Sequence, residues 1–264
     1  MNWRESISII IRRLFKDRSM WSGDFTSWQV ASQGSQGYSS DEILEKVKNS
    51  VLKVKHGEAV YERDSVLFKK IEYSWPLLAS LMWVAAKNNS SLKVLDFGGS
   101  LGSSYFQNRK FLDELRYVEW NVVEQESFVA TGRDCIEDQT LQFFYSIDEC
   151  ISKKGKPDIL ILACTLPYIE KPYELISELM NYNIPHIIID NTPFNSINKN
   201  RICQQKVPSY IYEATLPCWL LSYAEVKSVF KKKYYMITEH QNDSSMYVDG
   251  YKINYKGFLG MLKQ

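Results

Sequence analysis

Apolar and polar positions alternate along the last two thirds of the chain in two different rhythms. Short apolar runs predict strands over Leu92–Phe97, Val118–Glu124, Leu141–Tyr145, Asp158–Cys164, His186–Asp190, Lys233–Glu239 and Gly257–Leu262, with Asn242–Gly250 as the last turn region. Helical periodicity predicts helices over Ser103–Leu115, Glu126–Cys135, Ile147–Lys153, Pro172–Tyr182 and Ser222–Phe230. Strands that alternate with helices are typical of a mostly parallel sheet covered on both faces, so the pattern predicts an α/β fold.

The first ninety residues are predicted to be mostly helical. Apolar residues from Ile43 to Leu52 form the buried stripe of one helix, which Ser39 or Ser40 would cap. A second helix is expected from Arg63 to Lys70; Pro76 interrupts it, and it restarts over Leu77–Ala86. The segment Trp21–Tyr38 is rich in glycine, serine and aromatic residues and is predicted to be a loop. We therefore expect a helical cap region over residues 1–90 and a catalytic domain over residues 91–264.

Residues 1–18 have an amphipathic pattern with an excess of basic side chains. Two interpretations remain open for this segment. It could be a terminal helix packed on its own domain, or it could make peripheral contact with a membrane surface or a protein partner.

Composition narrows the class of protein. Lysine and arginine number 32 against 31 aspartates and glutamates, and the resulting net charge of +1 gives no sign of nucleic-acid binding. The 5 cysteines form no CxxC pair, which favours a reducing, cytoplasmic setting. No apolar run approaches the roughly 18 residues of a transmembrane helix. No cluster of histidine, cysteine and carboxylate has metal-ligand spacing, so we predict no metal.

The segment Val94–Gly102, which reads Val-Leu-Asp-Phe-Gly-Gly-Ser-Leu-Gly, joins the first predicted strand of the α/β region to its helix. Glycines let the backbone turn sharply and let a ligand approach without meeting Cβ atoms. In an open α/β sheet this position is the ligand crevice at the carboxyl ends of the strands. Glu124 ends the next strand, where its carboxylate can accept both hydroxyls of a ribose. These features predict a cofactor that contains a nucleoside.

Three details separate two kinds of cofactor. Phe97 stands where the first glycine of a dinucleotide loop belongs, and Ser100 stands where phosphate approach requires glycine. The carboxylate of Asp96 would repel a pyrophosphate but attract an ammonium group. The loop therefore favours a cofactor with an ammonium group over a nicotinamide dinucleotide.

Val94–Gly102 and Glu124 resemble motif I and the following acidic position of class I S-adenosylmethionine-dependent methyltransferases, and the similarity continues in order to Leu262. Ser100 departs from the glycine usual in that family. The resemblance implies a Rossmann-like, doubly wound, seven-stranded and mostly parallel sheet with an N-terminal helical cap, and S-adenosylmethionine as cofactor. It implies cofactor contacts at Asp96, Gly98, Gly99, Ser100, Gly102, Glu124, Gln125, Ser146, Cys164 and Thr165.

The family's pattern also implies roles for some of these residues. Asp96 would lie near the methionine amino group, Glu124 would hold the ribose, and Ser146 would contact the adenine. Cys164 and Thr165 would lie beneath the methyl-bearing sulfur.

The chain is also similar to methyltransferases found among surface-polysaccharide biosynthesis genes. This similarity rests on Gly37–Tyr38, Tyr61–Ser65, Asp96–Gly102 and Trp120–Gln125. It implies, by association, a sugar, glycan or glycan-phosphate acceptor.

A hydroxyl acceptor benefits from a general base, typically by ~10²–10⁴-fold. Asp190 ends the fifth predicted strand and is one candidate, although it could instead cap the turn Asn191–Pro193. The sequence Thr165–Tyr168 does not match the Asn/Asp-Pro-Pro-Tyr pattern of amino-methylating enzymes, which favours oxygen over nitrogen as the methylated atom.

Further candidates lie in the cap and in one loop. Glu62, Arg63 and Asp64 could bind the acceptor or supply a base, with Arg63 suited to a phosphate, or they could form a solvated charged turn. Tyr168 could line the acceptor pocket or pack in its loop. Of the histidines, only His56 is kept as a candidate base. His186 is expected to be structural, and His240 only ends the sixth strand.

The sequence thus predicts methyl transfer from S-adenosylmethionine to a small-molecule or glycan acceptor. Two other functions stay open. One is a nicotinamide-dependent (NAD) oxidoreductase or epimerase, and the other is a non-catalytic protein of this fold that binds a partner.

Overall fold

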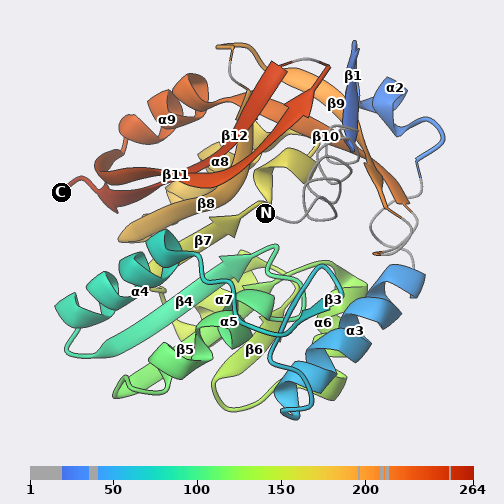
Figure 1. The fold of residues 1–264 in the computed structure, drawn as a ribbon. Coiled ribbons are helices and arrows are strands. Elements are labelled where there is room, and N and C mark those ends of the chain that lie inside the picture. Colours follow the sequence, from blue (N-terminus) through green and yellow to red (C-terminus); the bar gives the residue numbers. More distant parts are fainter. Residues whose placement is uncertain (1–19, 36–40, 196, 209–210, 212–213, 250) are drawn as a thin grey trace, which may run out of the picture.

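The computed structural model describes residues 20–264 except 36–40, 196, 209–210, 212–213 and 250 (Figure 1). The predicted helix over residues 1–18 and the pair Gly37–Tyr38 lie outside the described residues. So do Ser39 and Ser40.

Seven strands form the predicted sheet. They are β4 (Ser91–Phe97), β5 (Tyr117–Val123), β6 (Leu141–Phe144), β7 (Ile159–Ala163), β8 (His186–Asn195), β11 (Tyr234–Val248) and β12 (Tyr251–Leu262). Their order across the sheet is β6, β5, β4, β7, β8, β12, β11. The first five are parallel, and β12 runs antiparallel to both of its neighbours. The predicted Rossmann-like, mostly parallel sheet is confirmed.

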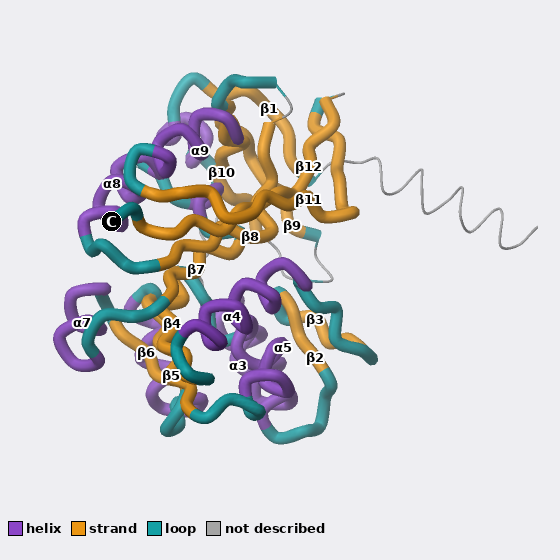
Figure 2. Tube along the Cα trace, turned by 90° about the vertical axis from the view of Figure 1, so that its left-hand side faces the viewer, coloured by secondary structure: helices purple, strands orange, loops and turns teal. Residues whose placement is uncertain are grey.

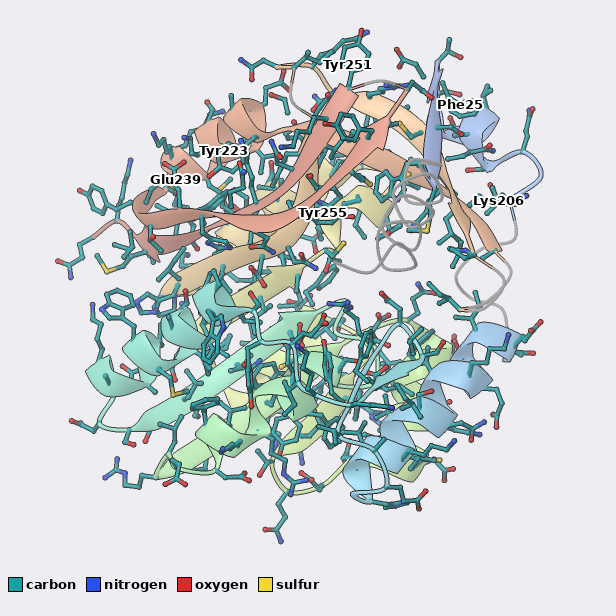
Figure 3. All side chains as sticks on the ribbon, viewed as in Figure 1. Phe25, Lys206, Tyr223, Glu239, Tyr251 and Tyr255 are labelled. Carbon is teal, nitrogen blue, oxygen red and sulfur yellow. The ribbon has the colours of Figure 1, made fainter. Side chains whose placement is uncertain are left out.

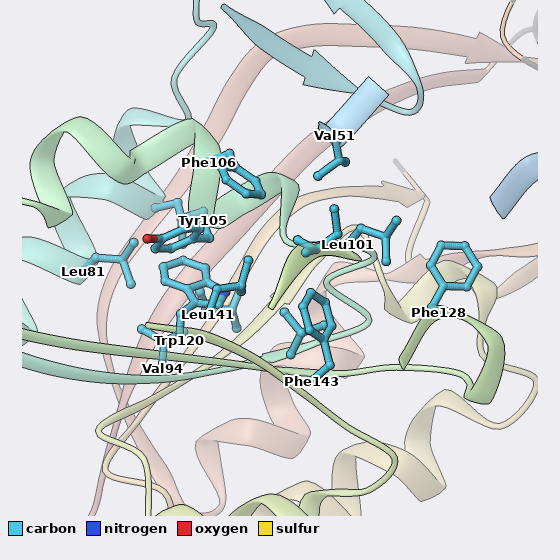
Figure 4. Close-up of a cluster of buried hydrophobic side chains, with 14 of the residues drawn as sticks. Val51, Leu81, Val94, Leu101, Tyr105, Phe106, Trp120, Phe128, Leu141 and Phe143 are labelled. Atoms are coloured by element: carbon cyan, nitrogen blue, oxygen red, sulfur yellow. The ribbon is translucent and has the colours of Figure 1, made fainter. Parts of the chain in front are cut away.

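Helices cover both faces of this sheet (Figures 1 and 2). One face carries α3 (Asp41–Lys55), α4 (Trp75–Lys87), α5 (Ser103–Leu112) and α6 (Glu126–Thr131), and the other carries α7 (Ile147–Lys154), α8 (Pro172–Asn181) and α9 (Tyr223–Lys231). Strand β7 serves both layers, because Ile161 packs in the first core while Leu160 and Leu162 pack in the second. Figure 4 shows the first core, where Trp120 and Phe143 of the sheet lie below Tyr105 of α5.

The segment Arg63 to Lys70 is not a helix, so that prediction was wrong. It belongs to a hairpin of β2 (Tyr61–Arg63) and β3 (Val66–Phe68), which lies beside α5 (Figure 2). Asp64 and Ser65 turn the chain with φ of 52° and 66°, both in the left-handed region, as the twist of a two-residue hairpin turn requires. Pro76 does not interrupt a helix either. It lies in the first turn of α4, where its missing N–H has no partner to lose.

The predicted loop Trp21–Tyr38 contains a strand, β1 (Trp21–Phe25), and a short helix, α2 (Trp28–Ser32). Strand β1 pairs with β9 (Arg201–Val207), β9 pairs with β10 (Ala214–Ser222), and β10 joins the end of β8. These three strands, which the sequence did not predict, extend the described sheet to ten strands. The turn region Asn242–Gly250 was predicted too long, because β11 and β12 pair up to Val248 and Tyr251.

The far edge of the sheet is tied to the helices by side chains. Tyr223 at the start of α9 donates a hydrogen bond to Glu239 Oε2 of β11 at 2.9 Å (Figure 3). None of the helices in the described part of the chain has the length and apolar character needed to cross a bilayer.

We expect Ile161→Ala to lower the free energy of unfolding by about 2–5 kcal/mol, because it leaves a cavity in the centre of the sheet. Ile161 is fully buried, whereas Ile237 of β11 is 41% exposed, so Ile237→Ala is the matched control. The control should change stability by less than about 0.5 kcal/mol. Urea denaturation measures both variants, and equal losses would contradict the central position of Ile161.

Candidate functional site

A cavity of about 900 Å³ lies at the carboxyl ends of the parallel strands. Ligands bind at this edge of open α/β sheets because the connecting loops leave a crevice there. The cavity brings together most of the predicted site residues: Arg63, Asp64, Asp96, Gly98, Gly99, Ser100, Glu124, Gln125, Cys164, Thr165, Tyr168 and Asp190.

Close packing excludes a side chain at two positions of the glycine loop after β4. A Cβ at Gly98, where φ is +72°, would lie 2.5 Å from the Thr165 methyl carbon. A Cβ at Gly99 would lie 2.5 Å from the carboxyl group of Asp96. Ser100 is itself left-handed, with φ of 53°. The loop therefore presents bare backbone to the cavity, as close approach of a ligand requires.

Asp96 places a buried carboxyl group beneath this loop. It is 1% exposed, and Trp120 Nε1 donates a hydrogen bond to its Oδ2 at 3.2 Å. Burial raises the pKa of Asp96 to about 7. The hydrogen bond from Trp120 lowers the pKa in part, and the Glu124 carboxylate raises it further. No cationic side chain in the described part of the chain forms an ion pair with Asp96. A ligand with a positive charge would stabilise the ionised form.

Glu124 is the second acidic group of the cavity. Its Oε1 accepts a hydrogen bond from the Ser100 N–H at 3.3 Å, and its Oε2 accepts one from the Gln125 N–H at 2.7 Å. Burial raises the pKa of Glu124, while these two bonds oppose the shift. Each carboxylate oxygen keeps a free lone pair, so the group can still accept two hydroxyls.

Three predicted residues do not line the cavity. Ser146 caps α7, where its hydroxyl accepts a hydrogen bond from the Glu149 N–H at 3.1 Å. Gly102 is the N-cap of α5, with φ of 89°, and a Cβ there would lie 2.8 Å from Leu141. Glu62 is buried behind the wall, where Ser103 Oγ donates to its Oε1, and burial raises its pKa to about 7.

Tyr145, one residue before Ser146, lines the cavity and was not predicted. The Arg133 guanidinium, which does not line the cavity itself, lies 4.5 Å from the centre of the Tyr145 ring. Tyr145 is 47% exposed, so the ring is available for stacking. An aromatic residue at the carboxyl end of the third strand was the signal that could have identified it.

A second group of residues surrounds the ends of β7 and β8. Cys164, left-handed with φ of 55°, donates its backbone N–H to the Asp190 carbonyl at 3.0 Å. Burial and the carboxylates of Asp64 and Asp190 raise the pKa of the Cys164 thiol to about 12. This thiol therefore stays protonated at neutral pH and is no nucleophile. Tyr168 donates its hydroxyl to Gln205 Oε1 at 2.8 Å.

The hairpin turn at Asp64 reaches this second group. Burial raises the pKa of Asp64, and the Arg63 guanidinium opposes the shift. Arg63 is held at the rim by Glu72, 3.3 Å away, and by the ring of Phe68. Backbone held in the left-handed region is common at ligand sites.

Two asparagines of this region were also missed. Asn242 Nδ2 donates to Asn191 Oδ1 at 2.9 Å, and both residues line the cavity. They come from β11 and β8, more than fifty residues apart, and carry no local motif.

Of the three histidines, only His186 lies where its predicted structural role places it. His56 is exposed after α3 and does not line the cavity. His186, at the amino end of β8, contacts the Asp158 carbonyl at 2.9 Å. His240, which was given no role, contacts Asp190 Oδ1 at 2.9 Å. Among the residues that the structure describes, no three His, Cys, Asp or Glu side chains are grouped as metal ligands.

Comparison with known proteins identifies the fold. No protein-family model matches the chain, and no curated protein matches its sequence. The chain is similar to the N-terminal domain of EvdMO1, solved in the presence of SAH and D-fucose, with 11% identity, a TM-score of 0.50, and 86% of this chain and 100% of that chain covered. This likeness shows a shared fold.

Two weaker likenesses complete the comparison. Magnesium protoporphyrin IX methyltransferase (ChlM) from Synechocystis PCC 6803 with bound SAM has 13% identity and a TM-score of 0.46, covering 86% of this chain and 100% of that chain. MccD protein has 9% identity and a TM-score of 0.47, covering 72% of this chain and 97% of that chain.

We expect Ser146→Ala to lower the free energy of unfolding by about 1 kcal/mol, because it leaves the first turn of α7 without its cap. Ser152 is exposed in the interior of the same helix. Ser152→Ala should cost nothing, since alanine has the higher helix propensity. Thermal or urea denaturation of the two variants separates capping from helix propensity, and a Ser146→Ala variant as stable as the wild type would refute the cap.

Proposed function

We propose that this protein is an S-adenosylmethionine-dependent methyltransferase. The observation that carries the proposal is the convergence, in one cavity, of a bare glycine loop, a buried carboxyl group without a cation and a second acid at the end of the next strand. These three features fit one molecule that has an ammonium group and a ribose.

The residues present fit the cofactor group by group. Asp96 would pair with the ammonium of the methionine moiety and gain the positive charge that its surroundings lack. Glu124 would accept the two ribose hydroxyls. The exposed face of Tyr145 would stack on the adenine, a role that the sequence had given to Ser146. Cys164 and Thr165 would lie at the sulfonium side.

When bound, the cofactor supplies an electrophilic methyl group. The contribution of the chain is to orient the two reactants, which can be worth roughly 7–11 kcal/mol of the barrier. Because the cavity lies at the upper end of the ~300–1,000 Å³ typical of ligand pockets, the cofactor leaves room for an acceptor.

We further propose an oxygen atom of a sugar, glycan or glycan phosphate as the acceptor. The second group of lining residues supports this choice, because amides and carboxylates pair with hydroxyl groups, and aromatic rings pack on sugar faces. These residues are Asp64, Tyr168, Asp190, Asn191, Gln205 and Asn242. Arg63 at the rim would suit a phosphate. The similarity to methyltransferases of polysaccharide gene clusters points the same way, and EvdMO1 was solved with D-fucose present.

The two other functions have less support. A dinucleotide would bring a pyrophosphate over the buried Asp96 carboxyl, whose ionised form would repel it. A protein that only binds a partner would need neither a bare loop nor acids lining a cavity.

All 5 cysteines are free, in keeping with a reducing cytoplasm.

The first experiment is calorimetric titration with S-adenosylhomocysteine, with NAD in parallel. We expect micromolar binding of S-adenosylhomocysteine alone, and Glu124→Gln should abolish it because the ribose loses its carboxylate. Glu126→Gln, a neighbouring acid on α6 that does not line the cavity, is the matched control and should keep wild-type affinity. Binding of NAD alone would overturn the proposal.

The pKa of Asp96 predicts a pH dependence for cofactor binding. Above pH 7 Asp96 is ionised and ready for the ammonium; as the pH falls below 7 it must lose a proton before it pairs. Affinity for S-adenosylhomocysteine should therefore fall with decreasing pH, by up to about tenfold per unit. Asp96→Asn should bind weakly and lose this slope. Calorimetry between pH 5.5 and 8.5 measures it, and an unchanged slope in the variant would assign the proton to another group, such as Glu62.

A further inference from the structure

His240 and Asp190 are in contact although they lie on strands that are not neighbours. His240 belongs to β11 and Asp190 to β8, and β12 runs between them. The contact from His240 Nε2 to Asp190 Oδ1 is 2.9 Å. A side chain on the intervening strand would block it.

Glycine at position 257 opens the path. On one side, Gly257 of β12 pairs with His240 of β11. On its other side, the pairing of β12 with β8 is interrupted by a bulge next to Ile189. A Cβ at Gly257 would lie 2.5 Å from His240 Nε2 and 2.1 Å from the Ile189 carbonyl oxygen. The imidazole therefore occupies the space that any other residue at this position would fill.

The contact fixes the orientation of the Asp190 side chain. A carboxylate oxygen only accepts, so Nε2 carries the proton in this hydrogen bond. His240 Nδ1 is buried and has no partner among the described residues, so Asp190 is the ring's one hydrogen-bond partner there. Asp190 Oδ2 also has no partner in the described part of the chain, and Asp190 lines the cavity. One oxygen is held, and the other is free for a ligand.

The position of Asp190 suits proton transfer. Asp190 pairs with Ala163 at the end of β7, and its carbonyl accepts the Cys164 N–H. It thus adjoins the residues assigned above to the sulfonium side. The Cys164 thiol, whose pKa is raised, interacts electrostatically with Asp190 and also with Arg63 and Asp64 of the hairpin. Of these, only Asp64 could compete as a base at neutral pH.

We propose that Asp190 accepts the proton of the acceptor hydroxyl and that His240 is a positioning residue that holds Asp190 for this step. The inference rests on the proposed methyl transfer. The hydroxyl oxygen forms a bond to the methyl carbon, the bond from that carbon to sulfur breaks with its electron pair staying on sulfur, and the hydroxyl proton passes to Asp190 Oδ2. Charge and atoms balance without a further reactant.

The test compares two methyl transfers catalysed by the full chain. One is transfer from S-adenosylmethionine to a panel of free and nucleotide-linked hexoses. In every assay, methanol is also measured, because it forms when water is the acceptor. The other is the exchange of methyl iodide with S-adenosylhomocysteine, in which no proton is removed. The ratio of the two rates isolates the base from general damage to the site.

In Asp190→Asn we expect this ratio to fall by about 10²–10⁴-fold. His240→Leu should lower it in the same direction, and His240→Gln, which retains an N–H donor, should restore most of it. His186→Gln removes another buried imidazole, from the opposite end of β8, and is the matched control that should keep the wild-type ratio. Affinity for S-adenosylhomocysteine, measured by calorimetry, checks that each variant is folded.

Three other outcomes would each contradict a different part of the proposal. A His240→Leu ratio equal to wild type, or a His240→Gln ratio as low as that of His240→Leu, would overturn the positioning role. A larger loss in Asp64→Asn than in Asp190→Asn would move the base to the hairpin. If the wild type neither binds S-adenosylhomocysteine nor exchanges methyl iodide, the proposed function itself fails.

Discussion

The central strands β4, β7 and β8 are covered by helices on both faces, and this burial decides where polar groups can stand. Within the covered length, residues such as Leu160 and Ile161 fill opposite cores, and a charge there would have to be neutralised or paired. Polar side chains therefore gather beyond the last covered residue, at the carboxyl edge. Asp96, next to the last residue of β4, still lies within the covered part of its strand, and its burial there raises its pKa.

The sequence was a good guide wherever structure is local. The β7 run Ile159–Ala163 is apolar throughout because both of its faces are buried, and its bounds could be predicted within a residue. The glycine loop was recognisable for a similar reason, since the requirement for bare backbone is met by adjacent residues. The half of the cavity that we propose for the cofactor depends on such short segments, so most of its lining could be proposed from the sequence.

Longer-range features could not be predicted. Val66–Phe68 is too short for its period to distinguish helix from strand, and the turn at Asp64 and Ser65 lacks the glycine that usually marks a hairpin. Ser146, which was expected to contact the adenine, caps α7 and does not line the cavity, because a serine at the end of a strand also suits a helix cap. The contact of His240 with Asp190 depends on the missing side chain of Gly257 in the strand between them. Nothing in the sequence near either residue indicates this contact.

Strand β1 pairs with β9, about 180 residues further along the chain, and the Gly23 N–H donates to Asp249 Oδ2 at 3.1 Å. By contrast, β4, β5 and β6 follow one another and need only local connections. During synthesis β4, which carries Asp96, can pair with β5, which precedes Glu124, before β9 and β10 are made, whereas β1 has to wait for its partner. Contacts of such sequence separation are slow to form. We therefore expect the two halves of the cavity to form at different times, with the wall proposed to receive the acceptor closing last.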